Sequence, residues 1–203
     1  MKSAVLLITI LAAGCFSVDT QQDWRTWTPK FTAKTAEEIV ASLPVGLSNV
    51  AVYATSSRFE VAGHYENGGG LSGFDLHLFC DGTYFFAYWA DISPMRIHES
   101  GQWRIKSDCI ILSMEKNYGP NYDMAPWRED RIYFLLNKGQ DLHLMGNHFW
   151  YSLFMKDRQL EKAFDWCSFI RKTKYDRFND ANVKAQLIDD SWKPWLTDEE
   201  KQS

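Results

Sequence analysis

Apolar and polar residues alternate along residues 74–114, and this pattern predicts two successive β-hairpins. The first hairpin has an Asp-Gly pair at its turn, and the second turns at residues 106–108. Trp103 and Ile105 point to the same side of the strand before the second turn, and the strand after it continues in phase. A strand that alternates in this way buries one face, so we expect these hairpins to form the centre of an antiparallel sheet.

Two geometries compete for the first turn. A two-residue loop pairs Cys80 with Thr83, whereas a three-residue loop with Gly82 in the left-handed region pairs Phe79 with Thr83. The difference of one residue inverts the return strand. We prefer the three-residue loop because it gathers six large side chains on one face. They are Phe74, Leu76, Leu78, Tyr84, Phe86 and Tyr88. Aromatic residues on the other face mean that both sides of the return strand are at least partly covered.

Shorter runs predict further strands on both sides of this centre. They lie at residues 50–53, 59–65, 131–136, 141–145 and 149–154. In the hairpin near residue 140, Leu142 and Leu144 face inward and His143 faces outward. Residues 91–100 are expected to form a loop. Residues 115–130 have no periodicity, so they are either a lid over a site or a loop packed on the barrel.

Helical patterns flank the predicted strands. Thr35 and Glu38 have the spacing of a capping box, which predicts a short helix at residues 35–42. From residue 157 the apolar period changes to 3.6, which predicts an amphipathic helix to about residue 174 that covers the sheet. A last short helix follows Asn179. The fold class is therefore mainly β, an antiparallel up-and-down barrel of about eight strands with flanking helices.

The N-terminus has the features of an export signal. Lys2 precedes an apolar run too short to span a bilayer, and small residues follow it. The segment LAAGC, ending at Cys15, resembles a bacterial lipoprotein signal in which the cysteine is lipidated, although Ala12 stands where leucine is most common. Plain secretion is the alternative. The chain then divides into a signal peptide (1–14), a tether (15–34), a barrel domain with helices (35–175), and a short helix and tail (176–203).

Composition limits the function classes. The chain has 22 basic and 26 acidic residues, scattered and nearly balanced, so we expect no nucleic-acid partner. Aromatic residues make up 15% of the chain, and these large side chains need either a filled core or a binding surface.

Three cysteines remain besides Cys15. In a four-strand meander, Cys80 and Cys109 would be about 14 Å apart, too far for a disulfide. We expect Cys80, Cys109 and Cys167 to be buried thiols.

The chain carries no specific signature of a catalytic, metal or cofactor site. The five histidines lack the spacing of a zinc motif, and the glycines at residues 68–70 precede a strand rather than a phosphate-binding helix. The strand residues His64, His77 and His143 converge only if their strands adjoin, so we assign no metal site. A glycosidase-type carboxylate pair is conceivable among three acidic residues. They are Glu60, Asp75 and Glu99.

The run from residue 63 to residue 112 resembles a pattern in uncharacterised exported bacterial proteins, often lipoproteins, with a lipocalin-like small β-barrel. The matching positions are Gly63, Tyr65, Gly70, Leu71, Leu76, Asp81, Gly82, Thr83, Tyr84, Gly101, Trp103, Asp108, Ile110 and Leu112. This resemblance implies a fold and carries no known activity.

We therefore expect an exported, lipid-anchored, non-catalytic barrel of the outer membrane or periplasm that binds a small apolar or amphipathic ligand. The candidate pocket residues are Phe74, Leu76, Leu78, Tyr84, Phe86, Tyr88, Trp103 and Trp127. The alternative is an envelope interaction module with a packed barrel. In this case, exposed tryptophans near the two termini of the chain contact a protein partner. These are Trp24, Trp27, Trp192 and Trp195. A hydrolase with a carboxylate pair is third.

Overall fold

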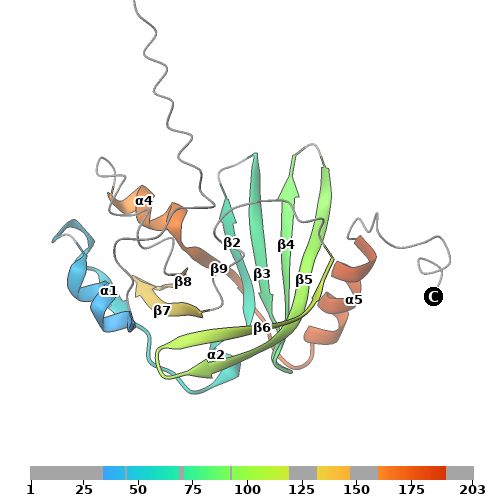
Figure 1. Ribbon diagram of the computed structural model, residues 1–203, viewed down its shortest axis with the longest axis horizontal. Coiled ribbons are helices and arrows are strands. Elements are labelled where there is room, and N and C mark those ends of the chain that lie inside the picture. The colour runs from blue at the N-terminus through green and yellow to red at the C-terminus, as the bar shows by residue number, and fades with distance from the viewer. Residues whose placement is uncertain are drawn as a thin grey trace, which may run out of the picture.

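The fold is an eight-stranded antiparallel β-barrel with one extra strand and several short helices, as predicted (Figure 1). The computed structural model describes residues 34–43, 45–68, 71–91, 93–118, 132–146 and 160–190. In these ranges, no helix has the length and apolar character needed to cross a membrane.

Eight strands follow one another around the barrel. They are β2 (Gly63–Gly68), β3 (Ser72–Leu78), β4 (Thr83–Ala90), β5 (Ser93–Lys106), β6 (Cys109–Asn117), β7 (Ile132–Lys138), β8 (Asp141–Gly146) and β9 (Phe169–Lys174). Each strand pairs with the next, and β9 pairs with β2 to close the barrel. The extra strand, β1 (Val50–Val52), pairs with the end of β7 that β6 does not reach.

Short helices lie around the barrel. They are α1 (Ala36–Ser42), the 3-10 turn η2 (Val45–Leu47), α2 (Arg58–Val61), α4 (Leu160–Cys167) and α5 (Asp180–Asp190). The predicted cap of α1 is confirmed, because the Thr35 hydroxyl accepts a hydrogen bond of 3.2 Å from the Glu38 amide. Figure 1 shows α2 at one end of the barrel and α5 beside β5. We call the end with α2 and the β3–β4 turn the turn end, and the opposite end the loop end.

The β3–β4 hairpin has the three-residue loop that the apolar pattern favoured. Leu78 pairs with Tyr84, and the Phe79 amide donates a hydrogen bond of 2.9 Å to the Thr83 carbonyl. Gly82 has φ +90°, a conformation that costs glycine little because it has no Cβ. This register sends one set of aromatic side chains into the barrel and the other set outward.

Rings from different walls meet inside the barrel. Phe169 on β9 contacts Phe86 on β4 at 6.0 Å and Tyr133 on β7 at 5.8 Å between ring centroids. Leu142 and Leu144 share this inner face, and His143 lies on the outer face, as predicted. The core therefore occupies the middle of the barrel.

The strand predicted at residues 59–65 is wrong in its first half. Residues Arg58–Val61 form α2, and β2 begins only at Gly63. The Ala62 amide donates a hydrogen bond of 2.7 Å to the Arg58 carbonyl, and Val61 is fully buried. The chain turns here and covers the end of the barrel. This helix is determined by tertiary packing, which the alternation of apolar residues along a strand does not predict.

The loop predicted at residues 91–100 is also wrong, because β5 begins at Ser93. Its polar residues His98 and Glu99 are buried rather than solvated, so they broke the apolar pattern without breaking the strand.

The long helix predicted at residues 157–174 ends at Cys167, and residues Phe169–Lys174 form β9. Ser168 marks the change, since its hydroxyl donates a hydrogen bond of 2.9 Å to the Phe164 carbonyl. The pairing of residues 169–174 with β2 and β8 is therefore more favourable than a continuation of the helix that the apolar period predicts. The strand predicted at residues 149–154 lies outside the described residues, as does most of the loop predicted at residues 115–130, although β6 extends to Asn117.

The cysteines Cys80, Cys109 and Cys167 are free thiols. Cys80 and Cys167 are buried as expected, whereas Cys109 is half-buried.

Candidate functional site

Seven of the eight predicted pocket residues lie together on the inner face of the barrel. Phe74, Leu76 and Leu78 on β3 are paired with Tyr88, Phe86 and Tyr84 on β4, and Trp103 follows on β5. Trp127 lies outside the described residues. The interior of β3, β4 and β5 is therefore the first candidate site.

The inner face is sealed at the turn end. Leu78 and Tyr84 are fully buried there, and the Arg58 guanidinium of α2 lies 5.8 Å from the centroid of the Trp103 ring. At the loop end, Phe74 is 9% exposed and Tyr88 is half-buried. Along these two strands, the inner wall therefore becomes more accessible toward the loop end.

A carboxyl group lies within this apolar wall. Glu99 on β5 is 3% exposed, and its Oε1 accepts a hydrogen bond of 2.7 Å from the Tyr84 hydroxyl. Burying a carboxyl group in an apolar setting requires polar partners, and the tyrosine supplies one of them. The interior therefore contains one buried carboxyl group beside its apolar side chains.

Asn67 adds a second polar group to the inner face, near the loop end. Its side-chain nitrogen donates hydrogen bonds of 2.8 Å to the carbonyls of Trp166 and Ser168. These bonds hold the C-terminal end of α4 and the following Ser168 against β2. Asn67 therefore has a structural role that the sequence pattern did not predict.

The three acidic residues considered for a catalytic pair lie on different surfaces. Glu99 faces the interior, Asp75 is on the outer face of β3, and Glu60 lies on α2 beside Tyr53 and Thr55. This arrangement does not bring the three carboxyl groups into one site.

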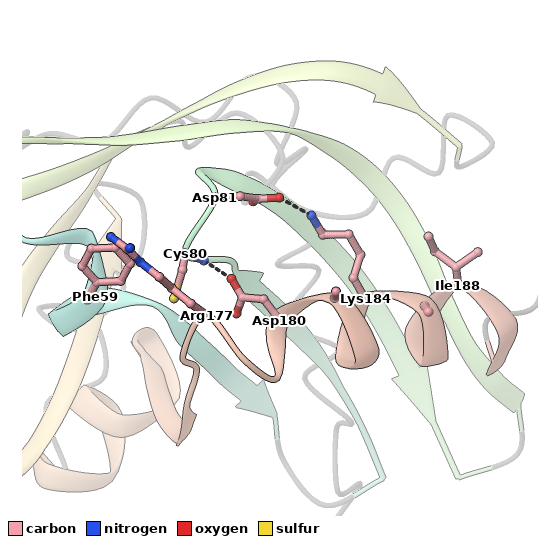
Figure 2. A pocket seen from close by; sticks show the side chains of 9 residues that line it. Phe59, Cys80, Asp81, Arg177, Asp180, Lys184 and Ile188 are labelled. Atoms are coloured by element: carbon pink, nitrogen blue, oxygen red, sulfur yellow. Dashed lines mark hydrogen bonds and ion pairs between the residues drawn. The ribbon is translucent and has the colours of Figure 1, made fainter.

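A groove on the outside of the turn end is a second candidate site (Figure 2). It has a volume of about 650 Å³, within the range of small-molecule sites, and it lies between Phe59 of α2 and the Ile188 side of α5. Its lining includes three apolar side chains of α5, those of Ala181, Ala185 and Ile188.

The charged groups of the groove already have partners. Lys184 pairs with Asp81 at 2.6 Å, the Arg177 guanidinium lies 4.1 Å from the centroid of the Phe59 ring, and Asp180 accepts a hydrogen bond from the Cys80 amide. Burial and, to a smaller extent, the charge of Asp180 together raise the pKa of the Cys80 thiol to about 11. The thiol is therefore protonated at neutral pH and is a poor nucleophile.

Two of the three strand histidines considered at the sequence level converge. His64 and His77 are direct partners on the outer faces of β2 and β3. His143 is elsewhere, where its Nδ1 forms a hydrogen bond of 2.8 Å with the Ser168 hydroxyl. The pairing of His64 with His77 depends on the register between two strands, and the spacing in the sequence did not determine that register.

Comparison with known proteins gives no further assignment. No protein-family model, curated protein or solved structure matches the chain. The functional argument therefore depends on the residues and the fold.

Proposed function

We propose that the protein is an exported, non-catalytic barrel that binds one small apolar or amphipathic molecule inside the loop end. The observation that carries the proposal is the asymmetry of the inner wall. Aromatic side chains are sealed at the turn end by Trp103 and α2, and they become more accessible at Phe74 and Tyr88. Barrels of eight strands have interiors that can hold one small ligand.

The chemistry of the wall selects the kind of molecule. An apolar body would pack against Phe74, Phe86 and Tyr88, since the Phe74 ring already contacts the other two rings. A head group with a hydrogen-bond donor, such as an amine, would meet the buried carboxyl group of Glu99. We therefore expect a preference for a cationic over an anionic amphiphile of the same chain length.

A displacement assay tests the preference. The neutral dye N-phenyl-1-naphthylamine should bind with a saturable rise in fluorescence, and dodecylamine should displace it at lower concentration than dodecanoate. Glu99→Gln keeps the shape of the side chain and should remove most of this difference. The proposal fails if the wild-type protein binds no dye, or if the Glu99→Gln variant keeps the full preference.

The matched control is Ile188→Arg, which changes the outer groove and leaves the interior intact. It should not change dye binding. Loss of binding in this variant would place the ligand in the groove of Figure 2 and would overturn the interior site. Native mass spectrometry of protein purified from its own envelope should also detect a copurifying small molecule.

We also propose that a lipid on Cys15 anchors the protein to a membrane, and this is tested separately. In a bacterial host, the wild-type protein should fractionate with membranes, and Cys15→Ser should release it to the soluble envelope fraction. An unchanged distribution would indicate plain secretion and would leave the ligand proposal unaffected.

A packed interaction module is the second candidate, favoured by the ring contacts that fill the middle of the barrel. The tryptophans expected to meet a partner lie outside the described residues. Among the described residues, Phe178 is 94% exposed and Trp166 is 58% exposed. A photo-crosslinking amino acid at position 178 should capture a protein in intact cells if this candidate is correct.

A further inference from the structure

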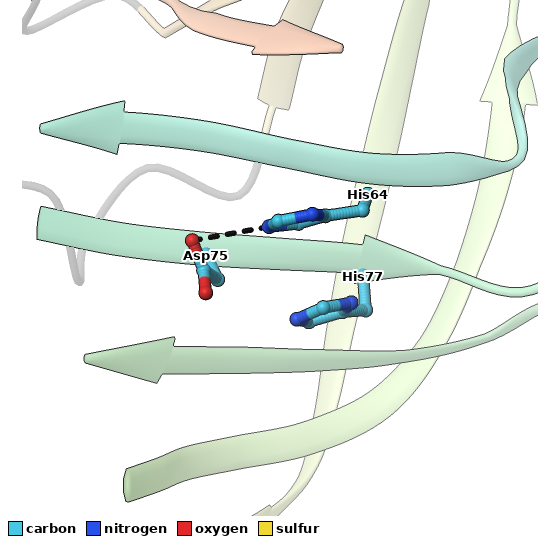
Figure 3. A group of neighbouring side chains, drawn as sticks. All are labelled: His64, Asp75 and His77. Atoms are coloured by element: carbon cyan, nitrogen blue, oxygen red, sulfur yellow. Dashed lines mark ion pairs between the residues drawn. The ribbon is translucent and has the colours of Figure 1, made fainter. Parts of the chain in front are cut away.

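Two histidines and an aspartate meet on the outer wall of the barrel, away from the proposed ligand site (Figure 3). His64 on β2 lies directly opposite His77 on β3, and Asp75 is two residues earlier on the same face of β3. The imidazole rings stack with centroids 4.5 Å apart and planes 7° from parallel. One ligand atom from each of the three side chains lies within 4.8 Å of the others.

These three side chains contain polar atoms that the described residues do not satisfy. The Nε2 atoms of both histidines and the Oδ1 atom of Asp75 are buried, and none has a hydrogen-bond partner. His64 Nε2 and Asp75 Oδ1 are 3.1 Å apart, a distance of close electrostatic contact without the alignment of a hydrogen bond. Buried polar atoms without partners are rare in proteins, and several that face one another call for an explanation.

The buried ring of His77 is held in one orientation by a tyrosine. Its Nδ1 forms a hydrogen bond of 2.7 Å with the Tyr175 hydroxyl, and the two rings are stacked at 6.2 Å. In the tautomer with the proton on Nδ1, this proton is donated to Tyr175 and the lone pair of Nε2 is available.

His64 is the most exposed of the three residues. Its side chain is 24% exposed and that of Asp75 is 12% exposed, whereas His77 as a whole residue is 4% exposed. We expect an ion to approach the group from the side of His64.

We propose that His64, Asp75 and His77 bind one divalent transition-metal ion of the zinc class. Two imidazole nitrogens and a carboxylate oxygen are ligands that such ions accept, and they leave a coordination position for water or an external ligand. Tetrahedral bonds of ~2.1 Å place ligand atoms about 3.4 Å apart, so the side chains close by small rotations around the ion. Tyr175 is the positioning residue, because it fixes the tautomer and the orientation of His77.

The first experiment uses the full chain, stripped with a chelator and titrated with Co²⁺ and with Zn²⁺. Co²⁺ should bind as one ion per chain and give the intense visible bands of tetrahedral coordination. X-ray absorption of the Zn²⁺ form should indicate two imidazoles among the ligands. The proposal is wrong if the wild-type chain binds neither ion stoichiometrically, or if the bound Co²⁺ has only the weak bands of an octahedral surface site.

Variants identify the ligands. His64→Gln and Asp75→Asn should each weaken Zn²⁺ binding by about 100-fold, and Tyr175→Phe should weaken it roughly tenfold. The matched control is His143→Asn, which changes another buried strand histidine and should bind Zn²⁺ like the wild type. Circular dichroism checks that each variant is folded. If His64→Gln retains wild-type affinity, or if His143→Asn loses as much as His64→Gln, the assignment is overturned.

Discussion

The indole nitrogen of Trp103 donates a hydrogen bond of 2.9 Å to the main-chain carbonyl of Phe79. The main-chain amide of Trp103 donates a second bond, of 2.7 Å, to the carbonyl of Gly82. One residue of β5 is thus tied at both its side chain and its backbone to the β3–β4 turn. This double attachment explains how the turn end of the barrel is sealed around a single buried ring.

Loss of the indole should destabilise the protein. Trp103→Phe removes the hydrogen bond to Phe79 and leaves a space in the core, so we expect the free energy of unfolding to fall by roughly 2–3 kcal/mol. Trp166→Phe is the matched control, because this tryptophan is 58% exposed, and it should change the stability by less than about 0.5 kcal/mol. Urea denaturation measures both, and equal effects would contradict the role of Trp103.

Gly101 should not accept a side chain. A Cβ atom there would overlap main-chain atoms of Ser113, Met114 and Glu115, none of which can rotate away. Gly101→Ala should therefore cost about 3 kcal/mol. Gly139 has φ +64° and open space around it, so Gly139→Ala should cost only the conformational strain, about 1 kcal/mol. Thermal unfolding of both variants gives the order, and the reverse order would refute the close approach of β5 and β6.

The stability should depend on pH through His143. Burial lowers the pKa of this ring to about 4 from its ordinary value of 6.5, with partial opposition from Asp165. Between these values the unfolded chain binds a proton that the folded chain does not, so the free energy of unfolding falls as the pH falls. The contribution is fully present above pH 6.5, and roughly 3 kcal/mol is lost by pH 4.

His143→Asn isolates this contribution, because asparagine remains neutral and can still bond to the Ser168 hydroxyl. Urea denaturation of chelator-treated protein at pH 7.5 and pH 4.5 should give a smaller pH effect in the variant than in the wild type. If both chains lose the same stability, His143 is not responsible for the effect.

The three described thiols should differ in reactivity. Cys109 is half-buried and lines a surface hollow of about 910 Å³ between α1 and the β5–β6 turn, whereas Cys80 and Cys167 are buried. An aromatic disulfide reagent at pH 8 should therefore modify Cys109 first, and the other two should react only after denaturation. Burial and Asp108 raise the pKa of Cys109, so its reaction should be slower than that of a small free thiol. Mass spectrometry of the digested protein identifies the site, and early labelling of Cys167 would contradict the expected order.

The register of the β3–β4 hairpin was predictable to the residue because the residues that determine it are close together in the sequence. The positive φ of Gly82 suits a three-residue loop, and that loop determines which side chain of β4 faces Leu78. The same local reasoning placed the cap of α1 at Thr35. Turn and cap residues act within a few positions of the chain, so a sequence pattern contains most of what determines them.

The start of β5 and the identity of β9 were not predictable in this way. Glu99 is polar yet faces the interior, where the Tyr84 hydroxyl satisfies part of its hydrogen-bonding capacity. Ile170 fits the helical period that begins at Leu160, yet it pairs with His143 in the barrel wall. Each of these outcomes depends on a partner that is distant in the sequence.

The candidate metal ligands show the same contrast between local and long-range information. The alternation of β3 placed His77 on the face opposite Leu76 and Leu78, but it did not identify what lies beside it. The register of β2 against β3 sets His64 next to His77, and local sequence does not determine that register.

The pairing of β2 with β9 joins the first and last strands of the barrel. Until residues 169–174 have been synthesised and have paired as β9, β2 and β8 each lack a neighbour that they have in the complete barrel. A chain truncated before β9 would therefore expose two unpaired edges that can recruit strands from other molecules. Folding should be limited by this long-range closure, and it is best completed only after the whole chain has been released.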